Sequence, residues 1–152
     1  MPSRHLLALG LDELRVGDQQ ATGGRTITET DIALWCAVTG DRFQLHTNAE
    51  YASKSGYGAI VAPGLMVLAM TSGLGVPADS PSIIANYGMD RVRYVLPVFV
   101  GDTVRADIEV VGKRERDADT GIADVRWTNV NQHEQVVSVR NLLVLMRRKV
   151  AE

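Results

Sequence analysis

Residues 63–75 read Pro63-Gly64-Leu65-Met66-Val67-Leu68-Ala69-Met70-Thr71-Ser72-Gly73-Leu74-Gly75. Proline is favoured at the start of a helix and glycine just after its end, so this segment predicts a helix from Pro63 to about Leu74. The segment is apolar on nearly every side, and a helix of that kind is buried in a core. We therefore expect other parts of the chain to cover this helix on all sides, and the kind of element that covers it decides the fold class.

Helix signals also precede this segment. Thr28 is a favoured N-cap, and the carboxylates of Glu29 and Asp31 suit the positive end of a helix that Gly40 would end. The sequence Thr47-Asn48-Ala49-Glu50 is a capping box, which predicts a short second helix from Thr47. Residues 28–77 are therefore expected to be mainly helical.

Strand signals follow the apolar helix. In residues 103–113, valine, alanine and isoleucine alternate with charged residues, which is typical of a half-buried strand. The predicted strands are Ser82–Tyr87, Asp90–Tyr94, Thr103–Lys113, Ile122–Val130 and Val136–Arg147. Hairpin connections between such strands indicate an antiparallel sheet. A sheet that curls around the apolar helix gives an α+β fold.

The composition describes one ordinary globular domain over residues 1–152, with 45% hydrophobic and 22% charged residues. A net charge of −2 and 5% aromatic residues argue against nucleic-acid binding. The single cysteine, Cys36, excludes an internal disulfide framework. The sequence shows neither a signal peptide nor an apolar run long enough for a membrane span, so we expect a cytoplasmic protein without membrane contact.

The chemistry-bearing residues lie between the first two predicted helices. Asp41 and His46 are five positions apart, which places them about 140° apart on a helix and on opposite faces of a strand. They can meet only if the segment bends, and Gly40 together with the helix start at Thr47 brackets such a bend. The competing interpretation is an ordinary helix end followed by a structural histidine.

Gly64 is the second candidate. At a helix N-terminus the first N–H groups lack backbone partners and carry partial positive charge. Without a side chain, Gly64 lets a ligand approach its N–H closely, so it could stabilise an oxyanion. The alternative is a proline-initiated helix whose glycine serves close packing.

Together these residues resemble the MaoC-like dehydratases, a family of R-specific enoyl-CoA hydratases with a hot-dog fold. The family pattern Gly-Asp-x-Asn-Pro-Leu/Ile-His is matched at Gly, Asp, Leu and His by residues 40–46. Ile60–Met66 resembles the family's entry to its central helix, and Leu96–Val104 resembles its Pro-Val-x-x-Gly-Asp-Thr strand entry. The sequence departs from the pattern in two places: Phe43-Gln44 replaces Asn-Pro, and Pro63 replaces a histidine.

The resemblance implies a hot-dog domain and a hydro-lyase that reversibly hydrates a trans-2-enoyl thioester to a 3-hydroxyacyl thioester in fatty acid metabolism. It implies that Asp41 and His46 hold one water, that His46 is the general base, and that the Gly64 N–H binds the thioester oxygen. It implies no metal, and no cofactor apart from the CoA or phosphopantetheine of the substrate.

The resemblance also implies partners. These are an acyl-CoA or acyl-carrier-protein thioester and a second copy of the chain, in a homodimer or an oligomer of dimers. The free edge of a long sheet independently favours such pairing.

Two alternative functions stay open. One is a hot-dog thioesterase, although residues 59–78 contain no carboxylate that could activate water at the helix. The other is a non-catalytic acyl-thioester-binding subunit of a hydratase complex.

Overall fold

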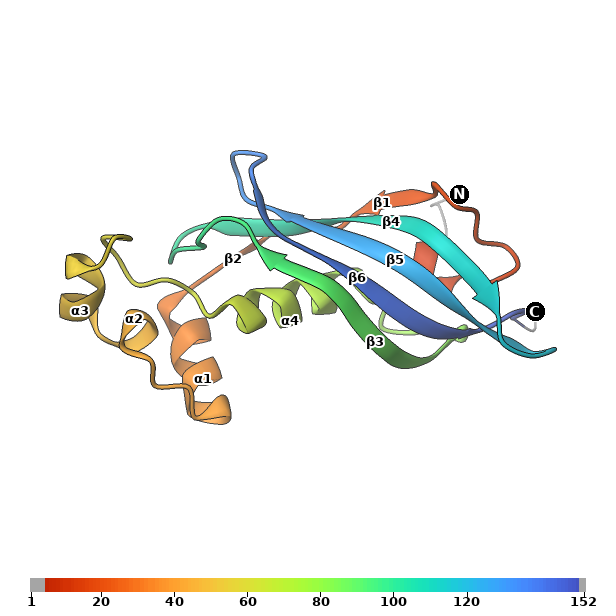
Figure 1. Ribbon diagram of the computed structural model, residues 1–152, viewed down its shortest axis with the longest axis horizontal. Helices are drawn as coiled ribbons and strands as arrows, with labels where there is room; N and C mark the ends of the chain where they lie inside the picture. The colour runs from red at the N-terminus through yellow and green to blue at the C-terminus, as the bar shows by residue number, and fades with distance from the viewer. Residues whose placement is uncertain (1–4, 151–152) are drawn as a thin grey trace.

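The computed structural model describes residues 5–150 and has an α+β architecture (Figure 1). In chain order its elements are η1 (Leu6–Ala8), β1 (Gln19–Ala21), β2 (Arg25–Thr26), α1 (Glu29–Thr39), α2 (Gln44–Thr47), α3 (Ala49–Lys54), α4 (Gly64–Gly75), β3 (Ile83–Tyr94), β4 (Thr103–Glu115), β5 (Thr120–Val130) and β6 (Val136–Arg147). The helical region precedes the long strands, as the sequence predicts.

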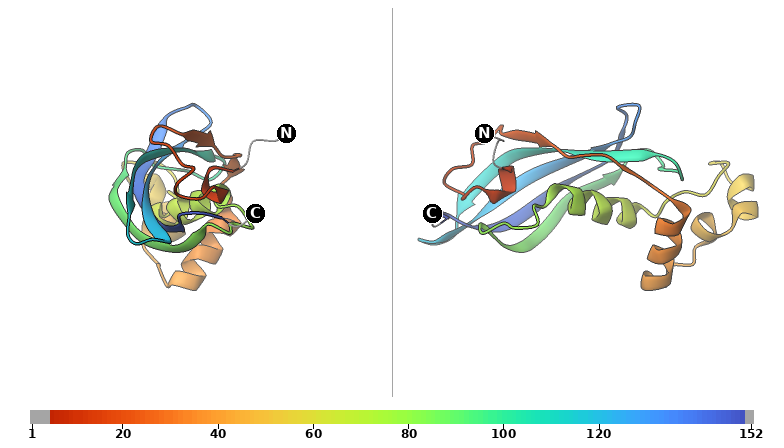
Figure 2. Two further views of the ribbon diagram at one scale, coloured as in Figure 1. Left: turned by 90° about the vertical axis from the view of Figure 1, so that its right-hand side faces the viewer. Right: turned by 180° about the vertical axis from the view of Figure 1, so that it is seen from behind.

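The long strands form one antiparallel sheet with the order β1-β4-β5-β6-β3, and β2 also pairs with β4. The sheet curls around α4, while α1, α2 and α3 project beyond one end of it (Figures 1 and 2). This arrangement confirms the α+β hot-dog fold. The segment that carries Asp41 and His46 thereby lies near Gly64, at the N-terminal end of α4.

Helix α1 begins and ends where the sequence predicts. The Thr28 hydroxyl accepts a hydrogen bond from the Asp31 N–H at 3.2 Å, and the Asp31 carboxylate accepts one from the Thr28 N–H at 2.9 Å. The Thr28 hydroxyl also donates to the Asp31 carboxylate at 2.7 Å, and this bond together with that from the Thr28 N–H holds the pKa of Asp31 below its ordinary value. At the other end, Gly40 has a φ of 74°, a conformation that favours glycine. Residue 41 therefore leaves the helix in a defined direction.

The prediction that α4 is buried all round is wrong for one stripe. Met66, Val67, Leu68 and Thr71 are buried, but Leu65 is 64% exposed and Ala69 is also exposed. In the single chain the sheet covers one side of the helix, so the other side is left open next to β3 (Figure 2).

The glycine at the end of α4 has a different role from the one predicted. Gly75 is the last helical residue rather than the residue after the helix, and a Cβ there would lie 2.4 Å from Cη2 of Trp127. Close packing against the sheet therefore requires a glycine at this position.

One predicted pair of strands is a single strand. The sequence predicts Ser82–Tyr87 and Asp90–Tyr94, whereas β3 runs continuously from Ile83 to Tyr94. Its pairing with β6 shifts register at three points, and Arg91 has a φ of 54°. Such bulges interrupt the alternation from which strands are predicted. β3 lies at the end of the sheet and so has a free edge.

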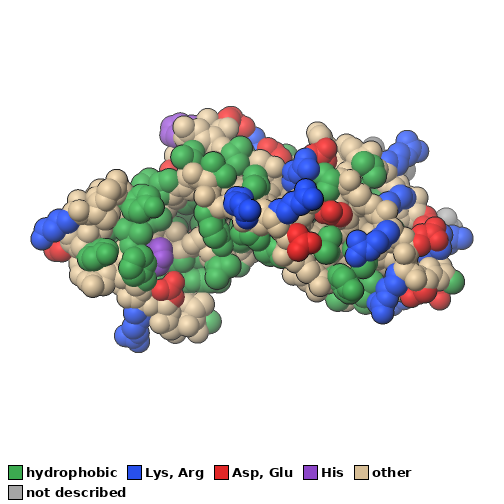
Figure 3. Space-filling model, viewed as in Figure 1, with side chains coloured by type: hydrophobic (Ala, Val, Ile, Leu, Met, Phe, Trp, Pro, Cys, Tyr) green, Lys and Arg blue, Asp and Glu red, His purple; other side chains and the backbone are tan. Residues whose placement is uncertain are grey.

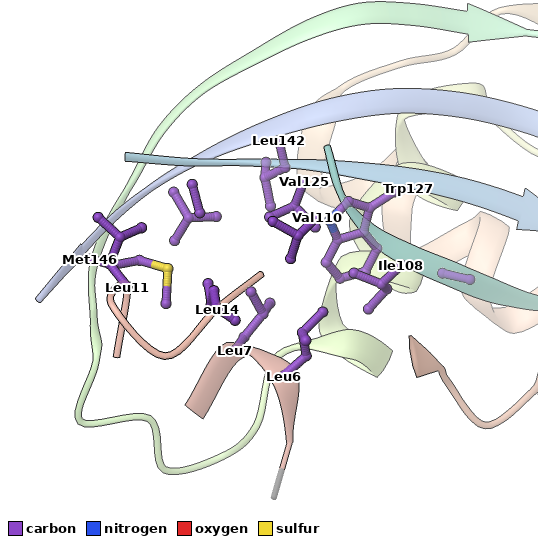
Figure 4. Packing of buried hydrophobic residues seen from close by; sticks show 13 residues of the cluster. Leu6, Leu7, Leu11, Leu14, Ile108, Val110, Val125, Trp127, Leu142 and Met146 are labelled. Atoms are coloured by element: carbon purple, nitrogen blue, oxygen red, sulfur yellow. The ribbon is translucent and has the colours of Figure 1, made fainter. Parts of the chain in front are cut away.

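The main core lies at the end of the sheet away from α1–α3 (Figure 4). Leucines from the N-terminal segment pack there against the concave face of β4, β5 and β6; the cluster includes Leu6, Leu7, Leu11, Leu14, Ile108, Val110, Val125, Trp127, Leu142 and Met146. A second cluster joins α1 to α4 and the sheet through Ile32, Cys36, Met66, Val67 and Val137. Within residues 5–150, no helix has the length and apolarity needed to cross a membrane.

Candidate active site

A cavity of about 650 Å³ opens at the N-terminal end of α4. It is lined by residues from α1, α2, the start of α4, the end of β3, the segment after β3, and β6. The lining residues include Trp35, Asp41, Leu45, His46, Tyr57, Val61, Gly64, Val67, Tyr94, Pro97, Val98 and Ser138. Figure 3 shows hydrophobic side chains gathered around the hollow in this half of the molecule. The structure thus brings Asp41, His46 and Gly64 to one cavity.

His46 lies in the one-turn helix α2, and one of its ring nitrogens is already engaged. Nδ1 lies 2.6 Å from the carbonyl oxygen of Val61. A carbonyl only accepts, so Nδ1 carries the proton and the neutral ring has its lone pair on Nε2. Nε2 makes no hydrogen bond to any of residues 5–150. The imidazole is thereby prepared to accept a proton.

The carbonyl that sets this tautomer is itself fixed. The Val61 N–H donates to Leu45 O at 3.3 Å, and Val61 forms an isolated antiparallel bridge with Phe99. The next residue, Ala62, donates its N–H to Val98 O at 2.8 Å. The imidazole is therefore oriented by backbone pairing between two segments that lie far apart in the sequence.

Asp41 follows the helix end at Gly40. Its Oδ1 accepts a hydrogen bond from the Phe43 N–H at 3.1 Å, and no described residue bonds its Oδ2. The turn over residues 40–43 supplies the predicted change of direction.

The second helix begins later than predicted. Asn48, not Thr47, caps α3 by accepting a hydrogen bond from the Tyr51 N–H. Thr47 instead belongs to α2, and its hydroxyl donates to Phe43 O.

The first departure from the family pattern has a visible packing role. The Phe43 ring meets the His46 ring edge to face, with 5.6 Å between centroids, and it also contacts Tyr51. Phe43 is itself 54% exposed. An aromatic side chain therefore holds one side of the imidazole at this position.

Gly64 is the first residue of α4, and Pro63 is its N-cap rather than its first helical residue. Pro63 provides no side-chain cap, so the first N–H groups of the helix are left for a ligand. A Cβ on Gly64 would lie 2.6 Å from Cε1 of Tyr94. Glycine thus lets the Tyr94 ring pack on the backbone at the mouth of the cavity.

Tyr94 and Ser138 are among the lining residues that sequence reasoning did not single out. Tyr94 reaches Gly64 only through the packing of β3 beside α4, which no local pattern indicates. Ser138 did have a signal, because it shares the inward face of β6 with Leu142, Val144 and Met146. Among the described residues, no group of three or more His, Cys, Asp or Glu side chains is placed to hold a metal.

Comparison with known proteins agrees with this architecture. A family model described as a MaoC like domain matches residues 14–131. The chain belongs to the MaoC-like family. A solved MaoC-like neighbour is the monoamine oxidase regulatory protein from Archaeoglobus fulgidus, which is 33% identical with a TM-score of 0.88; the alignment covers 94% of this chain and 96% of that one.

Two curated relatives carry names that describe an activity. The beta-methylmalyl-CoA dehydratase of Chloroflexus aurantiacus is 34% identical over 126 residues, which are 82% of this chain and 36% of the relative. The (R)-specific enoyl-CoA hydratase of Rhodospirillum rubrum is 29% identical over 113 residues, 74% of this chain and 76% of the relative. The MaoC-like chain spans between 33% and 41% of the length of three of its curated relatives.

Proposed function

We propose that this MaoC-like protein is a hydro-lyase that adds water reversibly to a trans-2-enoyl thioester, giving a 3-hydroxyacyl thioester. The observation that carries the proposal is the state of His46, whose Nδ1 is held by a carbonyl while Nε2 has no partner among residues 5–150. A carboxylate and a helix N-terminus line the same cavity. The names of its hydratase and dehydratase relatives support the same reaction class.

In this proposal Asp41 and His46 hold one water between them. Nε2 of His46 removes a proton as the water oxygen bonds to C3, and the C2=C3 electron pair moves toward C2 and the thioester carbonyl. The proton taken by His46 is then passed through Asp41 to C2, so one water is added in total. In the reverse direction the same two groups remove water.

The charge that develops on the thioester oxygen needs a donor. The uncapped N–H groups at the start of α4, with that of Gly64 first, provide donors and the positive end of the helix dipole. The chain itself thus supplies the base, the proton relay and the oxyanion site. We therefore propose a reaction that uses no cofactor beyond the CoA or phosphopantetheine carrying the acyl group.

We further propose that the working unit contains at least two copies paired along β3. β3 has a free edge and carries the exposed apolar side chains of Ile84, Tyr87 and Met89. Beside it, α4 leaves Leu65 open. A second copy would cover both surfaces, which a solvated monomer leaves unfavourably exposed.

The test is an assay with crotonyl-CoA. Loss of the enoyl absorbance without free thiol is expected for a hydratase, whereas release of thiol would identify a thioesterase instead. Asp41→Asn and His46→Gln should each lower kcat/KM by about a hundredfold or more, the scale of lost acid–base catalysis. His133→Gln, at an exposed position in the β5–β6 turn, is the matched control and should retain full activity.

Wild-type activity in Asp41→Asn or His46→Gln would contradict the assignment of these two residues. A wild-type protein that binds enoyl thioesters but turns none of them over would favour an acyl-binding subunit.

A further inference from the structure

Phe43 contacts both of the residues to which proton transfer is assigned. Its N–H donates to Oδ1 of Asp41 at 3.1 Å, and its carbonyl oxygen accepts a hydrogen bond from the His46 N–H at 2.9 Å. Its ring meets the His46 ring edge to face, with 5.6 Å between centroids. Any residue could make the two backbone bonds, whereas the ring contact requires an aromatic side chain. The side chain at position 43 therefore needs an explanation of its own.

The imidazole of His46 needs a second contact to be held in one orientation. The bond between Nδ1 and the Val61 carbonyl oxygen fixes one ring atom, but a ring held at one atom can still tilt about it. The contact with Phe43 restrains that tilt, because the two ring planes meet at 80° and the edge of one ring packs on the face of the other. Together the two contacts fix the direction in which Nε2 points.

The Phe43 side chain lies outside the cavity. Asp41, Leu45 and His46 line the cavity, whereas Phe43 is not part of its lining. Phe43 is more than half exposed, so it contributes little to the core. A substrate bound in the cavity would thus touch His46 without touching Phe43. Any effect of the Phe43 ring on the reaction must therefore pass through its neighbours.

A second aromatic ring supports Phe43. Tyr51 on α3 contacts it with 6.2 Å between ring centroids and 67° between ring planes. At the next position, the side-chain carbonyl of Gln44 accepts a hydrogen bond at 3.0 Å from Nδ2 of Asn48, the residue that caps α3. These two contacts connect α2 to α3. A helix of one turn such as α2 is not stable by itself and depends on contacts of this kind.

These contacts lie where the chain departs from the family pattern. Gln44 is the first residue of α2, the position at which a proline fixes a backbone angle in advance. Without that proline, the orientation of α2 depends on side-chain contacts with α3. The two replacing residues, Phe43 and Gln44, are the residues that make them.

We propose that Phe43 is a positioning residue: its ring, supported by Tyr51, holds the imidazole of His46 so that Nε2 faces the bound water. This inference rests on the proposed function and adds a residue to the same site. A misplacement of about 1 Å costs about a hundredfold in rate, so a base that only tilts more freely should lose less than that. Because Phe43 does not line the cavity, its loss should lower kcat and leave KM unchanged.

The kinetic test uses the 2-enoyl-CoA that the wild-type protein hydrates fastest, beginning with crotonyl-CoA. Phe43→Leu should lower kcat about tenfold with a KM within about twofold of the wild-type value, whereas Phe43→Tyr keeps the ring and should retain at least about half of the wild-type kcat. Tyr51→Leu removes only the supporting ring and should lower kcat about threefold. Val38→Ala, at an exposed position on α1, is the control and should leave kcat unchanged.

Two further measurements ask whether the ring acts through His46. In a His46→Gln background, Phe43→Leu should have no further effect on kcat, because the imidazole that Phe43 positions is absent. Nitrogen NMR of the neutral imidazole should show the Nδ1–H tautomer in the wild-type protein and a mixture of both tautomers in Phe43→Leu. A role in folding alone would change neither result.

Wild-type kcat in a folded Phe43→Leu variant would overturn the proposal, as would a raised KM without loss of kcat, or a full further loss in the His46→Gln background. If Phe43→Leu does not fold, Tyr51→Leu decides in its place, and wild-type kcat in that variant counts against the proposal. A wild-type protein that hydrates no enoyl thioester would refute the proposed function instead. The tautomer measurement would then decide whether Phe43 positions the imidazole.

Discussion

Replacing Arg140 by methionine tests whether its charge stabilises the fold. Burial lowers the pKa of Arg140 from its ordinary value to about 10. This difference corresponds to about 3 kcal/mol by which the interior disfavours the charged form. Because the pKa is lowered in the folded protein, this penalty is present in full below about pH 10 and diminishes only as the pH rises above that value. At neutral pH the charge therefore destabilises the folded protein.

The contacts of Arg140 that the methionine variant would lose contribute a free energy similar in size to this penalty. The cation–π contact with Trp127 contributes about 2 kcal/mol when desolvated, and each hydrogen bond to a hydroxyl about 1 kcal/mol. Thr71 and Ser72 would not be left unsatisfied, because both hydroxyls also donate to backbone carbonyls of α4. Methionine adds a sulfur–aromatic contact of about 1 kcal/mol. We therefore expect Arg140→Met to change the free energy of unfolding by about 1 kcal/mol or less.

The assay is urea unfolding at neutral pH without ligand, followed by tryptophan fluorescence at fixed protein concentration. Arg126→Met is the control for removal of an arginine at an exposed site, and we expect it to change stability by about 0.5 kcal/mol or less. Breaking a buried ion pair costs about 3–5 kcal/mol. A loss of that size in Arg140→Met would show that a carboxylate already neutralises Arg140 in the free protein, and the reasoning would be refuted.

Three further predictions concern packing, capping and assembly. Gly75→Ala should destabilise the protein by about 1–3 kcal/mol, because the added Cβ would overlap Trp127. Gly73→Ala meets no neighbour and should stabilise the helix by about 0.5–1 kcal/mol. Thermal unfolding of both variants checks this prediction, and equal melting temperatures would contradict it. Thr28→Ala should cost about 1 kcal/mol in the same measurement through loss of the α1 cap; an unchanged melting temperature would mean that the cap is dispensable. Tyr87→Lys on β3 should convert a dimer into monomers in sedimentation velocity while Val16→Lys should not; a monomeric wild type would reject the proposed pairing.

Most of the fold could be predicted because its signals are local. Strand β6 has the predicted bounds, Val136–Arg147, since its alternation is uninterrupted. Strand β3 could not be predicted as one element, because its bulges shift the alternation and the pairing that holds it together comes from β6. The exposed stripe of α4 was also missed, because the hydrophobicity of a helix does not say whether its own chain or another surface covers it.

The candidate site divides in the same way. Asp41, His46 and Gly64 belong to two short segments whose helix ends could be predicted, and the structure places all three in one cavity. The partner of His46 could not be predicted, because the carbonyl of Val61 is brought to Nδ1 by tertiary pairing. Arg140 was overlooked although it occupies an inward position on a strand of apolar residues, where an arginine is rare.

The bridge between Val61 and Phe99 limits how far the chain could be truncated without disturbing the candidate site. A peptide comprising residues 28–75 would include Asp41, His46, Val61 and Gly64, yet it would lack the segment around Phe99 that pairs with Val61 and holds its carbonyl in place. Its imidazole would exchange freely between its two tautomers, as free histidine does in water. Truncation should therefore abolish the proposed proton transfer before it removes any residue to which that transfer is assigned.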